Sequence, residues 1–227
     1  MDILFLHALP LDGSMWDAQR RFLPNPSYAP TLYGMGDSVG QWARAAVSLV
    51  KGDRMIVVGC SVGGSCALEV AAIAPERVAA LVLIGTKAQH RPDPALHGAA
   101  LSLLRNEGLE AAWRAFWAPL FSDATPHHVV DQAKGIALRQ TARDVEAGVT
   151  AFHSRPSRDG LLAQCRQPLV FVTGEDDRAP GRDANMVQAS QARNGALHIV
   201  PECGHYVPLE RPEAVNAILR DVITAQT

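Results

Sequence analysis

The most informative stretch of the chain is residues 54–75, which read RMIVVGCSVGGSCALEVAAIAP. An apolar run of strand length enters Gly59, and small and apolar residues at helical spacing follow Gly63 until Pro75 ends them. Between them lies Gly-x-Ser-x-Gly, a pattern typical of a serine on a tight turn from a strand into a helix. Such a strained turn requires neighbours without bulky Cβ groups, and the free N–H groups of the helix favour negative charge on a substrate oxygen. The stretch therefore predicts Ser61 as a nucleophile.

A second stretch, residues 36–40, also fits Gly-x-Ser-x-Gly, but its surroundings differ. Turn-rich sequence precedes it, and residues 41–47 continue with the pattern of an amphipathic helix. We therefore expect Asp37 or Ser38 to cap that helix by accepting hydrogen bonds from its first N–H groups.

Length and composition indicate one domain, residues 1–227, with a sizeable core. Hydrophobic residues make up 48% of the chain and charged residues 19%, which excludes a disordered protein. A formal net charge of −2 gives no indication of a nucleic-acid partner or an anionic membrane surface.

The first residues lack the basic segment of a signal peptide, and no apolar stretch approaches the roughly 20 residues that span a bilayer. The cysteines show no Cys-x-x-Cys spacing, so neither a zinc site nor a disulfide framework is predicted; they are Cys60, Cys66, Cys165 and Cys203. His127 and His128 have no acidic or cysteine companion at ligand spacing. We expect a cytoplasmic protein without a bound metal.

Apolar runs alternate with helical patterns along most of the chain. The predicted strands are Ile3–His7, Ser27–Leu32, Met55–Gly59, Val78–Ile84, Leu169–Thr173 and Ala196–Val200. The predicted helices between and after them are Ser14–Phe22, Val39–Val50, Val62–Ala74, Arg182–Ala192 and Pro212–Ala225. Continuous apolar strands that alternate with helices are typical of a doubly wound α/β fold, so we predict a mostly parallel sheet of about six strands with helices on both faces.

Residues 86–163 interrupt this alternation. Their apolar residues recur at helical spacing and none of them forms a strand-like run. We expect a cap of three or four helices inserted between two strands of the sheet.

Two loops that follow predicted strands carry the groups that an activated serine requires. Ligands bind at the carboxyl ends of the strands in such sheets, so the base and the acid should lie there. Asp176 and Asp177 follow the strand that ends at Thr173, and His205 follows the strand that ends at Val200. The chain order of serine, acid and histidine is that of the α/β-hydrolases.

Several motifs together resemble an α/β-hydrolase of the esterase, enol-lactonase and peroxidase-like group. Besides the serine turn, the resemblance rests on residues 7–10 (HALP), 34–38 (GMGDS), 75–83 (PERVAALVL), 204–205 (GH) and 210–213 (ERPE), and it spans nearly the whole chain except the helical insert. It implies a catalytic triad of Ser61, His205 and Asp177, with the backbone N–H groups of Leu9 and Val62 as the oxyanion hole.

The sequence departs from the family pattern at some positions. Ala8 stands where the family usually has glycine, and Pro10 has no N–H, which leaves Leu9 as the donor of that loop. The acid loop reaches Pro180 one residue early, so Asp176 stays an alternative to Asp177. The chain begins at the equivalent of the family's third strand, so we expect the N-terminal β-hairpin to be absent.

Aromatic side chains of the insert have two interpretations. Trp113, Phe116 and Trp117 recur at helical spacing, which fits either packing of the insert on the sheet or an apolar substrate pocket above the site. Arginines are also frequent in or near the insert, and one of them could receive a substrate carboxylate: Arg91, Arg105, Arg139, Arg143, Arg155 and Arg158.

The leading functional hypothesis is a serine hydrolase that needs no cofactor and cleaves a small or medium carboxylic ester or lactone through an acyl-enzyme on Ser61. A carbon–carbon bond hydrolase or perhydrolase with the same triad is an alternative, because fold does not determine function. A ligand-binding or signalling protein that retains a hydrolase pocket is another. A small-molecule substrate is the expected partner, and the chain could be a monomer or a homodimer.

Overall fold

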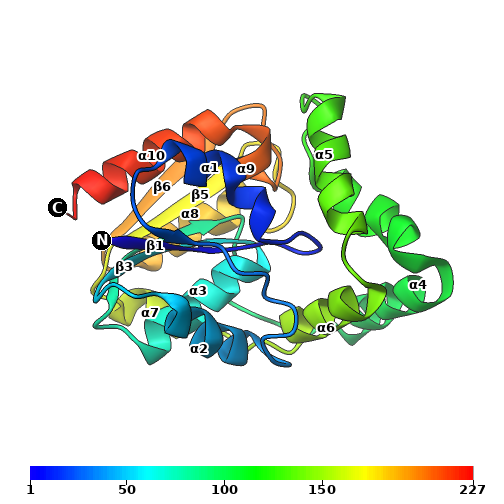
Figure 1. Ribbon diagram of the computed structural model, residues 1–227, viewed down its shortest axis with the longest axis horizontal. Helices are drawn as coiled ribbons and strands as arrows, with labels where there is room; N and C mark the ends of the chain where they lie inside the picture. Colours follow the sequence, from blue (N-terminus) through cyan, green and yellow to red (C-terminus); the bar gives the residue numbers. More distant parts are fainter. Residues whose placement is uncertain (227) are drawn as a thin grey trace.

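A six-stranded sheet lies at the centre of the molecule (Figure 1). The structure is a computed structural model, and it describes residues 1–226. The strand order is β2-β1-β3-β4-β5-β6, and every strand pairing within the described residues is parallel. The strands are β1 (Asp2–Leu6), β2 (Ser27–Tyr28), β3 (Met55–Cys60), β4 (Val78–Ile84), β5 (Leu169–Gly174) and β6 (Gly195–Val200). The predicted α/β fold with a largely parallel sheet of about six strands is confirmed.

Burial explains why the inner strands have continuous apolar sequences. Every residue of β1, β3, β4 and β5 is buried, because helices cover both faces of the sheet. The strand β6 at one edge is mostly exposed, and β2 at the other edge pairs over two residues only.

Helices cover the two faces in layers. In Figure 1, α1 (Asp17–Phe22) and α10 (Pro212–Thr224) lie on one side of the sheet, and α2 (Val39–Leu49) and α3 (Val62–Ile73) lie on the other. The helix α8 (Arg182–Gln191) packs against β5 and β6. Two short helices complete this part of the molecule: η1 (Gly13–Trp16) precedes α1, and α9 (Val207–Glu210) precedes α10.

All regular elements between β4 and β5 are helices. They are α4 (Pro94–Ala112), η2 (Trp113–Trp117), η3 (Ala118–Leu120), α5 (His127–Leu138), α6 (Ala142–His153) and α7 (Asp159–Gln164). In Figure 1, α4, α5 and α6 lie beyond the carboxyl ends of the strands, whereas α7 returns to contact α8. These helices therefore cover the edge of the sheet where ligands bind in α/β folds.

Two irregularities shape this insert. Gly108 has φ of 83° and kinks α4, a conformation that glycine adopts without strain. The following turn, η2, is a π-helix, which changes the direction of its side chains relative to a regular α-helix.

Candidate active site

Ser61 lies on the sharp turn between β3 and α3, with φ of 55° and ψ of −117°. A Cβ atom on Gly59 would come within 2.3 Å of the carbonyl oxygen of Gly63, and one on Gly63 within 2.1 Å of that of Leu6. The two glycines of the pattern therefore allow the strand and the helix to approach closely behind the serine. The half-buried Ser61 side chain lines a cavity on the other side.

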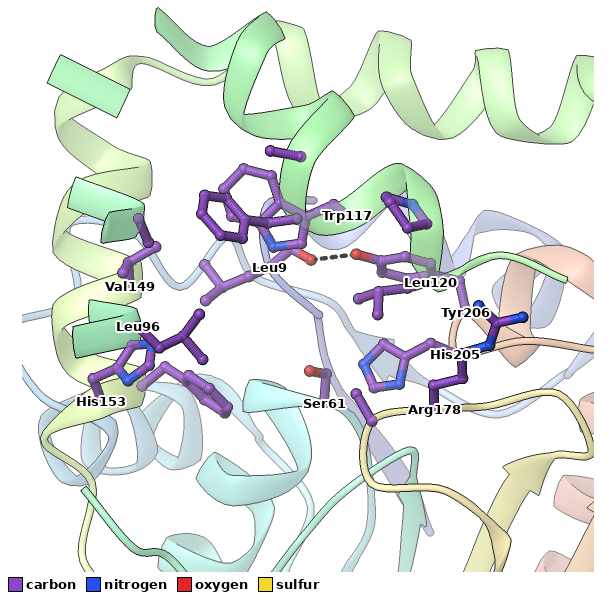
Figure 2. A pocket seen from close by; sticks show the side chains of 16 residues that line it. Leu9, Ser61, Leu96, Trp117, Leu120, Val149, His153, Arg178, His205 and Tyr206 are labelled. Atoms are coloured by element: carbon purple, nitrogen blue, oxygen red, sulfur yellow. Dashed lines mark hydrogen bonds between the residues drawn. The ribbon is translucent and has the colours of Figure 1, made fainter. Parts of the chain in front are cut away.

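The imidazole of His205 contacts a carboxylate from a neighbouring loop. Its Nδ1 lies 3.1 Å from Oδ1 and 3.2 Å from Oδ2 of Asp177, and both side chains are buried. The backbone N–H of Ala179 donates to the same Oδ1 at 2.8 Å, which holds the carboxylate in place. With Nδ1 facing Asp177, the Nε2 edge of the ring is left without a partner among the described residues, and Ser61 and His205 line the same cavity (Figure 2).

The neighbouring carboxylate, Asp176, has a different partner. Its Oδ2 accepts a hydrogen bond of 2.5 Å from the hydroxyl of Ser122, and within residues 1–226 its side chain forms no hydrogen bond with His205. Of the two aspartates that the sequence left open, the structure brings Asp177 to the histidine.

Two backbone N–H groups beside Ser61 are free to bind a substrate oxygen. Val62 is the first residue of α3, and Leu9 lies in the loop after β1 and lines the same cavity as Ser61. Within residues 1–226, neither N–H has an acceptor. The alanine at position 8 does not have a positive φ, and its N–H donates to the sulfur of Met15 at 3.3 Å.

Buried polar groups hold the Leu9 loop in position. The hydroxyl of Tyr206 donates to the carbonyl of Leu9 at 2.9 Å. His7 accepts a hydrogen bond from the N–H of Leu32 at Nε2 (2.8 Å), so its Nδ1 carries the proton and donates to the carbonyl of Ala8 (3.0 Å). Burial lowers the pKa of His7 to about 4, which keeps the ring neutral.

The candidate catalytic side chains line a cavity of about 430 Å³ between the sheet and the insert. Its walls are mostly apolar, and Figure 2 shows His153 and Leu96 on the side opposite His205. Besides Leu9, Ser61 and His205, the lining residues are Leu96, Ala100, Ala115, Phe116, Trp117, Pro119, Leu120, Val149, Phe152, His153, Arg178, Ala179 and Tyr206.

The aromatic residues expected at the pocket fall on two sides of η2. Phe116 and Trp117 line the cavity, but Trp113 does not. Trp113 is buried and packs against Phe121, with ring centroids 6.0 Å apart. Trp113 therefore packs within the insert, whereas Phe116 and Trp117 line the cavity.

Some lining residues were not identified from the sequence. Tyr206 directly follows His205 and Arg178 directly follows Asp177, so their positions in the two strand-end loops could have indicated them. His153 comes from the insert, where nothing in the sequence signals which face of α6 borders the cavity.

The second Gly-x-Ser-x-Gly pattern serves as a helix start. Ser38 is the N-cap of α2, and its hydroxyl accepts a hydrogen bond from the N–H of Gln41 at 3.3 Å. This confirms the capping role predicted from the sequence.

The described residues contain neither a metal-binding cluster nor a membrane-spanning helix. No three histidine, cysteine or acidic side chains of residues 1–226 are grouped in a way that could hold a metal ion. None of the helices in that range combines the length and hydropathy that a membrane crossing requires.

A parallel sheet with a serine on a strand-to-helix turn is the architecture of an α/β-hydrolase. Residues 3–218 match the Alpha/beta hydrolase family, and the chain belongs to this family. Lipase LipV of Mycobacterium tuberculosis is 27% identical over 241 residues, which cover 96% of this chain and 91% of the lipase.

Solved structures show the same fold. A thermophilic esterase from Thermogutta terrifontis has a TM-score of 0.90 at 23% identity, with 100% of this chain and 90% of the esterase covered. The enol-lactonase from Burkholderia xenovorans LB400 has a TM-score of 0.85 at 19% identity, with 98% and 91% covered.

Proposed function

We propose that the protein is a serine hydrolase that cleaves a small or medium carboxylic ester or lactone through an acyl-enzyme on Ser61. One observation carries the proposal: Ser61, with its positive φ, and His205, which is paired with Asp177, line the same cavity. Val62 follows Ser61 in the chain and Leu9 lines the same cavity, so their backbone N–H groups, which have no acceptor among the described residues, are the candidate donors for a developing oxyanion.

In the first half of this reaction, the Oγ of Ser61 attacks the substrate carbonyl while Nε2 of His205 takes its proton. Asp177 holds the ring in the tautomer with the proton on Nδ1 and stabilises the imidazolium that forms. The carbonyl oxygen becomes an oxyanion and binds the N–H groups of Leu9 and Val62. His205 then protonates the leaving alkoxide, and an acyl ester remains on Ser61.

In the second half, water attacks the acyl ester and gives its proton to His205. The tetrahedral intermediate collapses, the acid leaves, and the proton returns to Ser61. A lactone follows the same steps, except that its alcohol and acid stay in one product molecule.

The cavity supports an apolar substrate of limited length. Its volume of about 430 Å³ lies in the range of small-molecule sites, and aliphatic and aromatic side chains form most of its walls. We expect turnover of p-nitrophenyl esters to rise with acyl length and then fall once the chain exceeds the space beside Phe116 and Trp117.

The test is a series of p-nitrophenyl esters from acetate to octanoate, measured on the wild type, Ser61→Ala and Ser38→Ala. We expect Ser61→Ala to reduce kcat by at least about a thousandfold, because the nucleophile of a triad carries most of the rate, and Ser38→Ala to retain it. A fluorophosphonate probe should label Ser61, as mapped by mass spectrometry.

Equal loss in both variants would contradict Ser61 as the nucleophile. Turnover of a vinylogous diketone without turnover of esters would indicate a carbon–carbon bond hydrolase with the same triad. Absence of both labelling and turnover in a folded protein would favour a binding protein.

A further inference from the structure

Three cationic side chains surround a small cavity near the candidate active site, together with His90, whose pKa is lowered by burial and by the neighbouring Arg155. This basic pocket has a volume of about 230 Å³ and is lined by Lys87, Gln89, His90, Arg91 and Arg155, with no acidic residue among them. The first four lie in the loop between β4 and α4, and Arg155 follows α6. The pocket therefore collects positive charge from two segments that are distant in the sequence.

Arg155 is a buried cation without an anionic partner. Only 8% of the residue is exposed, and its Nη1 donates to the carbonyl of Phe152 at 2.5 Å. Its guanidinium carbon lies 3.8 Å from the centroid of the Phe152 ring. Its Nε is buried and has no acceptor, and no carboxylate within the described residues forms a salt bridge with it.

This state of Arg155 is costly unless something else compensates it. Burial lowers the pKa of Arg155 to about 10, so the side chain still carries its charge at neutral pH. A charged donor that is buried without an acceptor destabilises the folded protein.

In the described part of the chain, the carboxylates of the neighbouring segments have other partners and form no salt bridge with Arg155. Both oxygens of Glu69 accept from Arg158, at 2.7 and 2.8 Å. Asp93 caps α4 by accepting from the N–H of Leu96 at 2.9 Å, and Asp159 accepts from Ser157 at 3.0 Å.

The remaining basic groups are available to a bound molecule. Lys87 and Arg91 are exposed and form no salt bridge within residues 1–226. The loop that carries them is held in place at His90, whose backbone N–H donates to Ser157 at 2.9 Å and whose Nε2 donates to the carbonyl of His153, also at 2.9 Å.

We propose that the basic pocket binds a phosphate group. Phosphate has several acceptor oxygens and close to two negative charges, so it can accept hydrogen bonds from cationic side chains on more than one side. The planar guanidinium of an arginine can donate two parallel hydrogen bonds to it. A carboxylate, with one charge and two oxygens, would satisfy only part of this set.

The phosphate can be a free ion or a part of the substrate. The basic pocket and the active-site cavity share a wall, because Phe152 and His153 line the cavity while Arg155 lies against Phe152 and lines the pocket. A substrate phosphate would have to pass Phe152 to reach the basic pocket while the carbonyl lies at Ser61, and the second arm of the test decides between these two sources.

The first arm of the test is calorimetric titration with inorganic phosphate at constant ionic strength. We expect saturable binding to the wild type and at least a tenfold increase in Kd in the double variant Lys87→Gln/Arg91→Gln, whose positions are exposed and outside the candidate catalytic set. The control Arg193→Gln/Arg220→Gln removes the same charge at exposed positions elsewhere and should leave Kd unchanged.

Lack of saturable binding to the wild type, or equal weakening in the two double variants, would overturn the proposal. This arm measures binding without turnover, so it stands apart from the proposed esterase function.

The second arm compares KM for two matched esters, one with a terminal phosphate and one with a terminal hydroxyl. A lower KM for the phosphorylated ester that is lost in Lys87→Gln/Arg91→Gln identifies the phosphate as part of the substrate. Binding of inorganic phosphate in the first arm without this KM difference supports the pocket as a site for the free ion.

Discussion

Gly85 contacts the candidate active site although it has no side chain. It follows β4 with φ of 55°, and a Cβ atom there would lie 2.9 Å from both Cε1 and Nδ1 of His205 and 3.3 Å from Oδ2 of Asp177. A side chain of any size would therefore displace the imidazole from its position between Asp177 and Ser61.

We predict that Gly85→Ala reduces kcat for p-nitrophenyl esters by about a hundredfold or more while KM changes little, because small misplacement of a catalytic group is costly. Steady-state kinetics with a thermal melt will separate this effect from unfolding. Gly98→Ala is the matched control, since its Cβ would meet no atom within 4 Å, and we expect it to keep full activity. Unchanged kcat in folded Gly85→Ala would argue against a catalytic role for His205.

Single residues also show where prediction from sequence reaches its limit. Position after a strand was enough to select the loops of Asp177 and His205, because parallel strands bring their carboxyl ends to one edge. It favoured Asp177 but kept Asp176 as an alternative, since adjacent residues in a loop point in different directions according to its turns. Trp113 differs from Phe116 and Trp117 for a similar reason: the π-helical turn η2 alters which side chains face the cavity.

At the level of elements, the Glu210 carboxylate joins the histidine loop to the insert. Buried at the end of α9, it accepts from the backbone N–H groups of Gly204 and Tyr206, both at 2.9 Å. From the insert it accepts from the N–H of Ser122 at 3.0 Å and the hydroxyl of Thr125 at 2.5 Å. Residues on both sides of His205 are thus tied to the segment that follows η3.

We predict that Glu210→Gln lowers the free energy of unfolding by about 3 kcal/mol or more, because an amide has one acceptor oxygen and turns donors toward the N–H groups that the carboxylate accepts. Urea denaturation measures the change. The exposed Glu213→Gln in α10 should stay within about 0.5 kcal/mol of the wild type. An equally stable Glu210→Gln would show that these four hydrogen bonds contribute little to stability.

The sequence predicted which elements exist better than it predicted their bounds and local geometry. The apolar runs located the strands of the described residues, yet the edge strand expected at residues 27–32 pairs only over Ser27 and Tyr28. Helical spacing predicted helices in residues 86–163, but the kink at Gly108 and the start of α4 at Pro94 depend on local backbone geometry that hydrophobic periodicity does not encode.

For the molecule as a whole, the pH dependence of stability tests how the loop that carries Leu9 is held in the core. His7 is fully buried after β1, and both ring nitrogens form hydrogen bonds to backbone groups, which requires the neutral ring. Burial lowers its pKa from 6.5 to about 4 in the folded protein. Between these two values the unfolded chain binds a proton that the folded chain does not, so stability is complete above pH 6.5 and falls as the pH falls toward 4.

We predict that protonation of His7 in the unfolded chain lowers the free energy of unfolding by about 2–3 kcal/mol as the pH falls from 6.5 to 4.5. A tenfold difference in proton affinity corresponds to about 1.4 kcal/mol. The measurement is urea denaturation at several pH values on the wild type and His7→Gln. The glutamine oxygen can accept from the N–H of Leu32 but does not titrate, so the variant should show the shallower pH dependence. Carboxylates and the partly buried His153, whose pKa burial also lowers to about 4, are common to both chains and cancel in the difference. If the free energy of unfolding depends on pH in the same way in both proteins, His7 is not held neutral in the folded state. Its hydrogen bonds would then not be what fixes the loop of Leu9.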